Sequence, residues 1–406
     1  MRFRPRRLAE TLARAATTFP AILVTGPRQS GKSTLLRHTF KKHAYLSMER
    51  PDLRASATAD PLAFFDQHPT PLVLDEIQNA PALLPFIQAR IDEDRSPGQW
   101  VLSGSQSFPL MKGISESLAG RVAVLTLHPV AREEAAGFKA DVSIDEILAR
   151  VFSSPGDARP SRRTRIDLAD WLLRGGYPEP RFNADVDRQL WCSGYVQTYL
   201  QRDVRNLLNV GDLSTFTGFI QLCAARSGCL LNMTGLARDA GISGPTVKRW
   251  LSVLEASHLI QLVRPYPQNY GKRITKGPKL YFLDTGLLTF LLGLHLREAL
   301  LQGPSFGPVF ETAVIAEWVK AFAHRGEPAS LYFFRSPDLE VDLIVERNQR
   351  LYGIEVQATS TPVPRHADSL RKWLRLTGDH AQGVVACAID APTPLAPGVR
   401  AVPWQL

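Results

Sequence analysis

The sequence predicts an α/β fold for the first third of the chain, a mainly helical middle and a smaller α/β region at the end. Residues 21–25, 72–74, 100–102 and 122–127 are short apolar runs with the length and branched side chains of buried parallel strands. Residues 30–38 and 80–91, which lie between these runs, have helical spacing. Because strands alternate with helices, we expect an open parallel sheet here.

The spacing of apolar residues changes twice in the rest of the chain. Residues 153–163 are polar and rich in Pro and Arg, which predicts a linker or insert, and residues 166–262 have apolar side chains at helical spacing. The last part predicts a helix at 308–322, strands near Leu331, Val341 and Leu351, a helix at 367–376 and a strand at 383–388. We therefore expect a first domain at 1–135, a linker at 136–165, a helical domain at 166–300 and an α/β domain at 301–406.

The composition is that of a globular protein with a basic surface. The 406 residues carry 48 Lys and Arg against 39 Asp and Glu, a net charge of +9. Such a surface attracts polyanions, DNA or a nucleotide among them, although an Arg-rich protein can be basic without binding DNA. With 44% hydrophobic residues the chain is expected to fold, and its length of 406 residues predicts two to four domains.

Cysteine usage and hydropathy predict a cytoplasmic protein. The four cysteines form no CxxC pair and no metal-ligand spacing, so neither a zinc site nor a disulfide framework is indicated. The basic start has no signal-type apolar segment after it, and no run reaches the roughly 18 apolar residues of a membrane helix.

One segment predicts phosphate binding. Residues 26–33 fit GxxxxGK[ST] between an apolar strand and a helix, the context in which this loop wraps its backbone N–H groups around phosphates. Lys32 is expected against the β- and γ-phosphates and Ser33 on Mg²⁺. The alternative is a glycine turn that merely joins strand to helix. The expected ATP-binding residues are Gly26, Pro27, Arg28, Gln29, Ser30, Gly31, Lys32, Ser33 and Thr34.

A second segment supplies the acids that a P-loop NTPase requires. Asp75 and Glu76 end the apolar run 72–74. An Asp-Glu pair after a strand can simply cap a helix, but its place about 40 residues after the phosphate loop favours catalysis. We expect Asp75 to hold Mg²⁺ through water and Glu76 to polarise the attacking water.

Two further residues are candidates for the same chemistry. Ser105 follows the next apolar run and is expected to sense the γ-phosphate or the water. Arg121, in a loop after Gly120, is a candidate for stabilising transition-state charge, with a solvent-exposed arginine as the alternative.

Residues 236–250 predict two helices joined by a glycine turn at Gly241, the spacing of a helix-turn-helix. Thr246, Lys248 and Arg249 open the second helix, where a recognition helix presents side chains to the major groove. Such folds also serve as protein-contact modules, so both DNA and protein partners stay open.

The tail carries acids spaced as in nucleases of the PD-(D/E)xK type. Asp342 and Glu355 lie on adjacent predicted strands, with Glu311 on the helix before them, and are candidate Mg²⁺ ligands. Gln357 stands where such nucleases carry lysine, which leaves an altered or inactive site, or merely solvated strand ends, as alternatives.

With these motifs in place, the whole chain resembles a large prokaryotic family of AAA-type ATP-binding proteins with a C-terminal domain of unknown function. The resemblance implies a P-loop ATPase domain at 1–135, a winged-helix-like segment within 166–300 and a restriction-endonuclease-like domain at 301–406. The segments that carry it are 26–33, 72–76, 102–105, 118–121, 174–178, 199–203, 281–286 and 340–342.

The sequence therefore predicts an Mg²⁺-dependent ATPase that couples its nucleotide state to its C-terminal domains. One form of this hypothesis has the protein act on DNA. The alternatives are a DNA-binding regulator or scaffold with ATP as a ligand, and a metal-dependent nuclease. The expected partners are ATP, Mg²⁺ and DNA, with no membrane. A homo-oligomer in which Arg121 or Arg202 completes a neighbour's site is also considered.

Overall fold

The computed structural model describes residues 3–104, 113, 117–137, 142–152, 166–199, 213–267 and 277–406. The chain divides into two compact units. The first consists of Met1–Val130 with the short segments Ala256–His258 and Ala323–Glu327, and the second contains the remainder. The expected linker at 153–163 lies outside the described residues.

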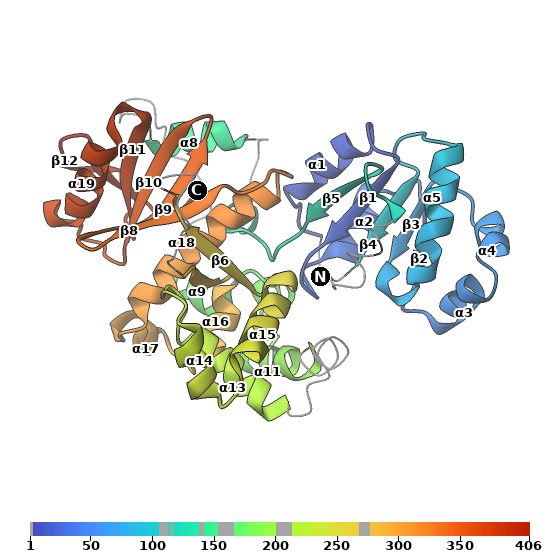
Figure 1. The fold of residues 1–406 in the computed structure, drawn as a ribbon, viewed down its shortest axis with the longest axis horizontal. Helices are drawn as coiled ribbons and strands as arrows, with labels where there is room; N and C mark the ends of the chain where they lie inside the picture. The colour runs from blue at the N-terminus through green and yellow to red at the C-terminus, as the bar shows by residue number, and fades with distance from the viewer. Residues whose placement is uncertain are drawn as a thin grey trace. The chain divides into compact units, whose positions relative to one another are not determined.

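The first unit is built on a parallel sheet, drawn in blue to teal in Figure 1. Its strands pair in the order β2-β3-β4-β1-β5, and every pair is parallel, as the sequence predicts. The strand that the sequence did not reveal is β2, whose side chains are only partly buried and lack an apolar run. The strands are β1 (Ala21–Thr25), β2 (Ala44–Ser47), β3 (Leu72–Asp75), β4 (Trp100–Ser103) and β5 (Val122–Thr126).

Helices cover both faces of this sheet, because successive strand residues point to opposite sides. One core joins Leu72, Leu74 and Leu102 with α4 (Pro61–Gln67) and α5 (Leu84–Glu93), next to α3 (Pro51–Ala59). The other core joins Val73 and Val101 with α1 (Leu8–Ala15) and α2 (Lys32–Thr39). A short 3₁₀ turn, Pro81–Leu83, occupies the start of the helix predicted at 80–91, and a second one, Ile77–Asn79, precedes it.

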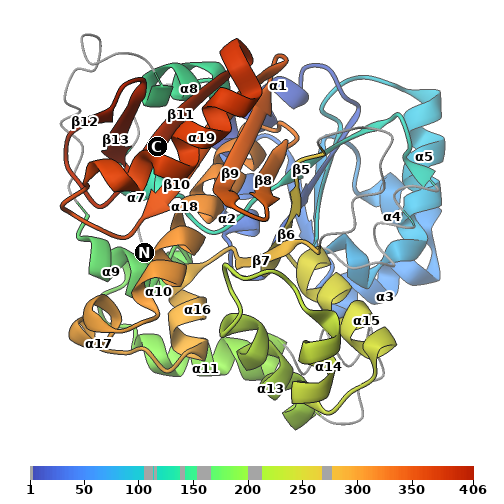
Figure 2. The same cartoon turned by 60° about the vertical axis from the view of Figure 1, so that its left-hand side comes forward.

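The second unit begins with helices and continues into an eight-stranded mixed sheet (Figure 2). Among the described residues, its helices before the first strand are α7 (Arg132–Ala135), α8 (Ile144–Phe152), α9 (Leu168–Arg174), α10 (Pro178–Phe182), α11 (Arg188–Tyr199), α13 (Leu213–Ala224), α14 (Met233–Ala240) and α15 (Gly244–Ala256). The antiparallel pair β6 (Ile260–Pro265) and β7 (Lys279–Phe282) comes next.

The end of the chain has the order of elements that the sequence predicts. After α16 (Thr285–Leu291) and α17 (Arg297–Gln302) come α18 (Phe306–Ala323), β8 (Leu331–Ser336), β9 (Leu339–Arg347), β10 (Arg350–Gln357), α19 (Asp368–Thr377) and β11 (Ala381–Cys387). Two strands that lack an apolar run, β12 (Thr393–Ala396) and β13 (Val399–Pro403), extend the sheet beyond β11.

The helical part and the tail form one unit because they share a sheet and a core. Strand β6 pairs in parallel with β8, with Arg264 opposite Tyr332, so the order runs β12-β13-β11-β10-β9-β8-β6-β7. A single apolar cluster contains Phe216 and Trp250 from the helical part as well as Trp318 and Val345 from the tail. A domain boundary near residue 300 is therefore not visible as a break in packing.

The glycine-rich segment at 174–178 joins two helices of this unit. Gly175 has φ 64°, and a Cβ there would lie 2.3 Å from an Asp284 carboxylate oxygen. The same carboxylate accepts hydrogen bonds from the Gly176 amide at 2.7 Å and from the Leu287 amide at 2.9 Å, which begins α16. Segments 174–178 and 281–286 thus contact each other, which gives both a structural role.

No helix within the described residues has the length and apolar character needed to cross a bilayer.

Candidate functional site

The loop between β1 and α2 has an unusual backbone that its residues permit. Gly26, Gln29 and Gly31 have φ values of 137°, 58° and 97°, in the region that glycine adopts most easily. A Cβ on Gly26 would lie 2.2 Å from the Leu127 carbonyl oxygen, so only glycine fits against the segment after β5. The glycines of the predicted phosphate motif are therefore required by the fold of the loop.

The first turn of α2 presents the polar residues of the motif. Gly31 precedes Lys32 as the N-cap, so the N–H groups of this helix end at the loop. The Lys32 ammonium lies inside the loop, 3.0 Å from the Gly26 carbonyl oxygen and 2.9 Å from that of Pro27. Ser33 is partly buried and Thr34 is exposed. A helix N-terminus with one buried ammonium beside it is suited to a polyphosphate.

An arginine near the start of the chain supports the loop from behind. The buried Arg6 donates from Nη1 to the Ser30 carbonyl oxygen at 2.8 Å and from Nη2 to the His128 carbonyl oxygen at 2.7 Å. It thereby joins the phosphate loop to the segment after β5. Sequence reasoning missed Arg6, because a contact over 24 residues leaves no local pattern.

Asp75, at the end of β3, is held by residues of two neighbouring strands. Its two carboxylate oxygens accept hydrogen bonds from the Ser103 hydroxyl at the end of β4 and from the Tyr45 hydroxyl in β2. Asp75 is 3% exposed, so its carboxyl group is poorly solvated and these two hydrogen bonds fix its orientation. Neither Ser103 nor Tyr45 was predicted.

Tyr45 joins Asp75 to α2. Burial raises the pKa of the Tyr45 phenol to about 12, and the Asp75 carboxylate adds to this, while hydrogen bonds with Arg37 and Ser33 act in the opposite direction. The Arg37 guanidinium lies 3.9 Å above the Tyr45 ring. The two predicted Mg²⁺ residues, Ser33 and Asp75, therefore share Tyr45 as a neighbour.

Glu76 follows Asp75 in a conformation that is rare for its residue type. Its φ is 56°, and its amide donates to the Ser103 hydroxyl at 3.3 Å. The Gln78 side-chain amide donates to the Glu76 carboxylate. A left-handed backbone at a non-glycine residue costs about 1–3 kcal/mol and is commonly found at functional sites. Ser103 and Gln78 thus fix the backbone and the side chain of Glu76.

The two remaining candidates of the first unit have different outcomes. Ser105 lies outside the described residues. Arg121 precedes β5, and its carbonyl oxygen accepts from the Ala21 amide at the start of β1, so it lies at the sheet edge opposite the phosphate loop. Its guanidinium binds both carboxylate oxygens of Asp92, at 2.7 and 2.9 Å. Arg121 is therefore not placed to act on this chain's own loop, contrary to the expectation.

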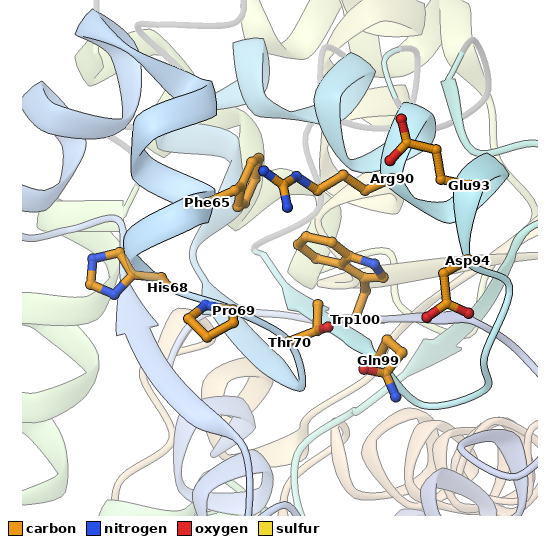
Figure 3. Close-up of a pocket in the computed structure, with 9 residues that line it drawn as sticks. All are labelled: Phe65, His68, Pro69, Thr70, Arg90, Glu93, Asp94, Gln99 and Trp100. Atoms are coloured by element: carbon orange, nitrogen blue, oxygen red, sulfur yellow. The ribbon is translucent and has the colours of Figure 1, made fainter.

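A cavity of about 200 Å³ lies at this opposite edge of the sheet (Figure 3). Its lining includes Trp100, at the start of β4, and Arg90, whose guanidinium lies 5.6 Å from the centre of the Phe65 ring. None of its lining residues belongs to the phosphate loop or to the Asp75 network.

Two helices joined by a glycine turn occupy the segment of the predicted helix-turn-helix. Gly241, with φ 66°, ends α14, and the Ser243 hydroxyl accepts from the Thr246 amide at 3.3 Å as α15 begins. Lys248 and Arg249 are exposed, Thr246 is partly buried, and Val247 and Trp250 are buried. The amphipathic start of α15 therefore directs two cations to the surface.

The tail acids surround a lysine that sequence reasoning did not single out. Lys279, in β7, places its ammonium 2.7 Å from Glu340, 3.2 Å from Glu311 and 3.4 Å from Asp342. The second Asp342 oxygen accepts from the Val356 amide at 2.9 Å, and Gln357 donates to Glu355 at 3.4 Å. We call Lys279, Glu311, Glu340 and Asp342 the lysine cluster.

Burial and mutual repulsion shift the pKa values of this region. Burial, together with Asp342, raises the pKa of Glu311 to about 7 and that of Glu355 to about 9. Burial lowers the pKa of Lys279, but the surrounding carboxylates outweigh it and raise the value to above its ordinary range. Within the described residues, no three His, Cys, Asp or Glu side chains are arranged as ligands of one metal ion.

Comparisons of the sequence with known families match three segments. The profile of an AAA domain matches residues 18–136. Two profiles of domains of unknown function match residues 165–298 (DUF8612) and 306–406 (DUF4143).

Among curated proteins, uncharacterized proteins of Mycobacterium tuberculosis and Mycobacterium bovis are each 33% identical over 362 residues, which is 88% of this chain and 74% of theirs. Among solved structures, a Walker-type ATPase of Pyrococcus abyssi is 16% identical, with a TM-score of 0.42 over 70% of this chain and 94% of that one.

The close contact at Gly26 gives a first prediction. Replacing Gly26 with Ala forces the loop away from Leu127, so we expect the affinity for a fluorescent ATP analogue to fall below that of the wild type. The matched control is Gly120→Ala, which also alters a glycine with positive φ (73°) but meets no atom within 4 Å. Equal affinities of the two variants would contradict the account.

Proposed function

Because this chain belongs to the prokaryotic family of AAA-type ATP-binding proteins, we propose that it binds ATP with Mg²⁺ and hydrolyses it at the edge of the sheet formed by β1, β3 and β4. The observation that carries the proposal is the convergence of three elements there. The phosphate loop follows β1, Asp75 and Glu76 end β3, and Ser103 ends β4 and contacts both acids.

The loop supplies the binding energy for the polyphosphate. Its backbone N–H groups and the N-terminus of α2 favour negative charge, and the Lys32 ammonium within the loop is suited to the β- and γ-phosphates. Gln29 and Gly31 adopt the positive φ values that direct successive amides inward. We assign the remaining residues of 26–34 to the same cradle.

Mg²⁺ bound with the nucleotide would neutralise phosphate charge, and the residues present suit it. The Ser33 hydroxyl and the Asp75 carboxylate are hard oxygen ligands, both next to Tyr45. Ser103 and Tyr45 hold the two Asp75 oxygens in fixed directions, which suits ligation through water.

Glu76 is the residue we assign to the attacking water. Its carboxylate follows the metal-binding aspartate directly, and the hydrogen bonds from Ser103 to its backbone and from Gln78 to its side chain limit its motion. A fixed carboxylate orients a water molecule and accepts its proton as the γ-phosphoryl group departs. Gln78 is therefore a positioning residue for Glu76.

A second candidate function, DNA contact through α15, rests on the exposed Lys248 and Arg249. The helix pair α14 and α15, followed by the antiparallel strands β6 and β7, fits a winged-helix-like module. This module and the net charge of +9 support the hypothesis of an ATPase whose nucleotide state is coupled to a DNA-binding part. The alternative is a DNA-binding regulator or scaffold that holds ATP with little turnover.

We also propose a cytoplasmic location. The four cysteines are free thiols, which fits a reducing compartment.

Two variants separate binding from hydrolysis. Lys32→Ala is expected to lose ATP binding, because the phosphates lose their buried cation. Glu76→Gln keeps the size and hydrogen bonding of the side chain but cannot accept a proton, so we expect near-normal ATP binding and a turnover about 10²–10⁴-fold lower. Calorimetric ATP binding and phosphate release measure the two effects. The proposal fails if Glu76→Gln turns over ATP at the wild-type rate, or if Lys32→Ala binds ATP normally.

DNA binding by α15 is tested by salt dependence. The double variant Lys248→Ala/Arg249→Ala is expected to bind duplex DNA more weakly, with the slope of log affinity against log salt reduced by about 2, because two phosphate contacts are lost. The control is Lys372→Ala/Arg375→Ala, which removes the same charge from exposed positions of α19. If both double variants behave alike, or if the wild type binds no DNA at low salt, α15 is not the DNA-binding helix.

A further inference from the structure

The tail has the order of elements and the acids of a metal-dependent nuclease, yet a lysine lies among those acids. We propose that Lys279 is the resident cation of the lysine cluster and takes the place of a divalent metal ion. The lysine cluster then holds the strand pair β6 and β7, which follows the helix-turn-helix, against α18 and β9 of the tail. This proposal is independent of the ATP site.

The fit of a metal ion fails first at Asp342. A PD-(D/E)xK site needs an aspartate with oxygens available for a metal ion. Here one Asp342 oxygen lies 3.4 Å from the Lys279 ammonium, and the other accepts from the Val356 backbone amide at 2.9 Å. Asp342 is thus satisfied by the protein itself.

Glu311 is occupied at one of its two carboxylate oxygens. Its Oε1 accepts from Lys279 at 3.2 Å and from the Tyr281 hydroxyl at 2.5 Å, and both donors lie on β7. Residues two apart on a strand face the same side, so β7 directs an ammonium and a phenol at one carboxylate. Two donors of β7 therefore compete with a metal ion for this oxygen.

The ammonium is satisfied by this arrangement. Lysine has three N–H donors, and Lys279 has three carboxylate neighbours in Glu311, Glu340 and Asp342. Its side chain is 4% exposed, so the carboxylates are what keep it charged inside the protein. A divalent ion at the same acids would be repelled by this buried positive charge.

Gln357 is a further departure from the residue pattern of these nucleases. At this position a nuclease of this type uses a lysine, whereas Gln357 is uncharged and donates to Glu355 at 3.4 Å. The positive charge of the region is therefore on β7, at Lys279, and none is on β10 at residue 357.

The arrangement has a mechanical consequence within the second unit. Strand β7 pairs with β6, which directly follows α15, and Lys279 binds acids on α18 and β9. The lysine cluster therefore fixes the strand pair behind the candidate recognition helix to the tail. Acids that bind a metal ion in a nuclease active site hold β7 to the tail in this protein.

Metal titration of the intact chain tests the proposal. We expect Mn²⁺ binding to the nucleotide-free protein, followed by electron paramagnetic resonance, to give the same isotherm for the wild type and for Asp342→Asn. Both proteins should leave plasmid DNA uncut with Mg²⁺ or Mn²⁺. A Mn²⁺ site that disappears in Asp342→Asn, or cleavage that this substitution abolishes, would overturn the proposal.

A second experiment removes the lysine. Lys279→Met keeps the length of the side chain but leaves the acids without a cation, so its melting temperature should fall below that of the wild type and rise again with Mn²⁺. The rise should be absent from Lys279→Met/Asp342→Asn.

The matched control is Lys320→Met, which removes another buried lysine of this unit, one that pairs with Glu317 at 3.2 Å. It should lose stability without gaining a response to Mn²⁺. A folded Lys279→Met that is no more sensitive to Mn²⁺ than Lys320→Met would contradict the proposal. If Lys279→Met does not fold, the wild-type titration decides the question alone.

Discussion

The parallel pairing of β1, β3 and β4 is the constraint on which the candidate ATP site depends. In a parallel sheet the carboxyl ends of all strands meet at one edge, so Thr25, Asp75 and Ser103 end their strands together. The phosphate loop, the acids and the serine that orients them come from segments that are distant in sequence. Gly26 keeps the loop close to the segment after β5, and the Ser103 hydroxyl joins the ends of β3 and β4.

In the second unit, a buried ionic contact adds to the shared sheet and the shared apolar core. Such contacts add little net stability, because desolvation offsets the attraction, but they specify one arrangement over others. Lys279 fits this description, since its carboxylate partners lie on α18 and β9. An apolar cluster that spans the helical part and the tail supplies the bulk of the packing. The lysine cluster and the apolar core together explain why the helical part and the tail form one compact unit.

The sequence predicted those features that depend on local pattern. Short apolar runs gave β1, β3 and β4, and the glycine spacing gave the phosphate loop and the turn before α15. Tyr45, Ser103, Arg6 and Lys279 escaped prediction, because each acts through a partner at least 24 residues away. Arg121 was predicted to act at the phosphate site but lies at the opposite edge of the sheet. Its position after Gly120 does not reveal at which end of a strand it lies. Strands β2 and β12 were missed because none of their side chains is fully buried and neither forms an apolar run.

Turnover of ATP by the wild type and by Ser103→Ala, with ATP binding measured on the same samples, tests the central claim most directly. Loss of the serine hydroxyl leaves the phosphate loop intact but releases Asp75 and the Glu76 backbone. A hydrogen bond to a charged group is worth about 1.5–3 kcal/mol, so we predict Mg²⁺-dependent turnover by the wild type and roughly 10–100-fold slower turnover by the variant, with binding preserved. Absence of turnover in the wild type, or equal turnover in the two proteins, would contradict the account.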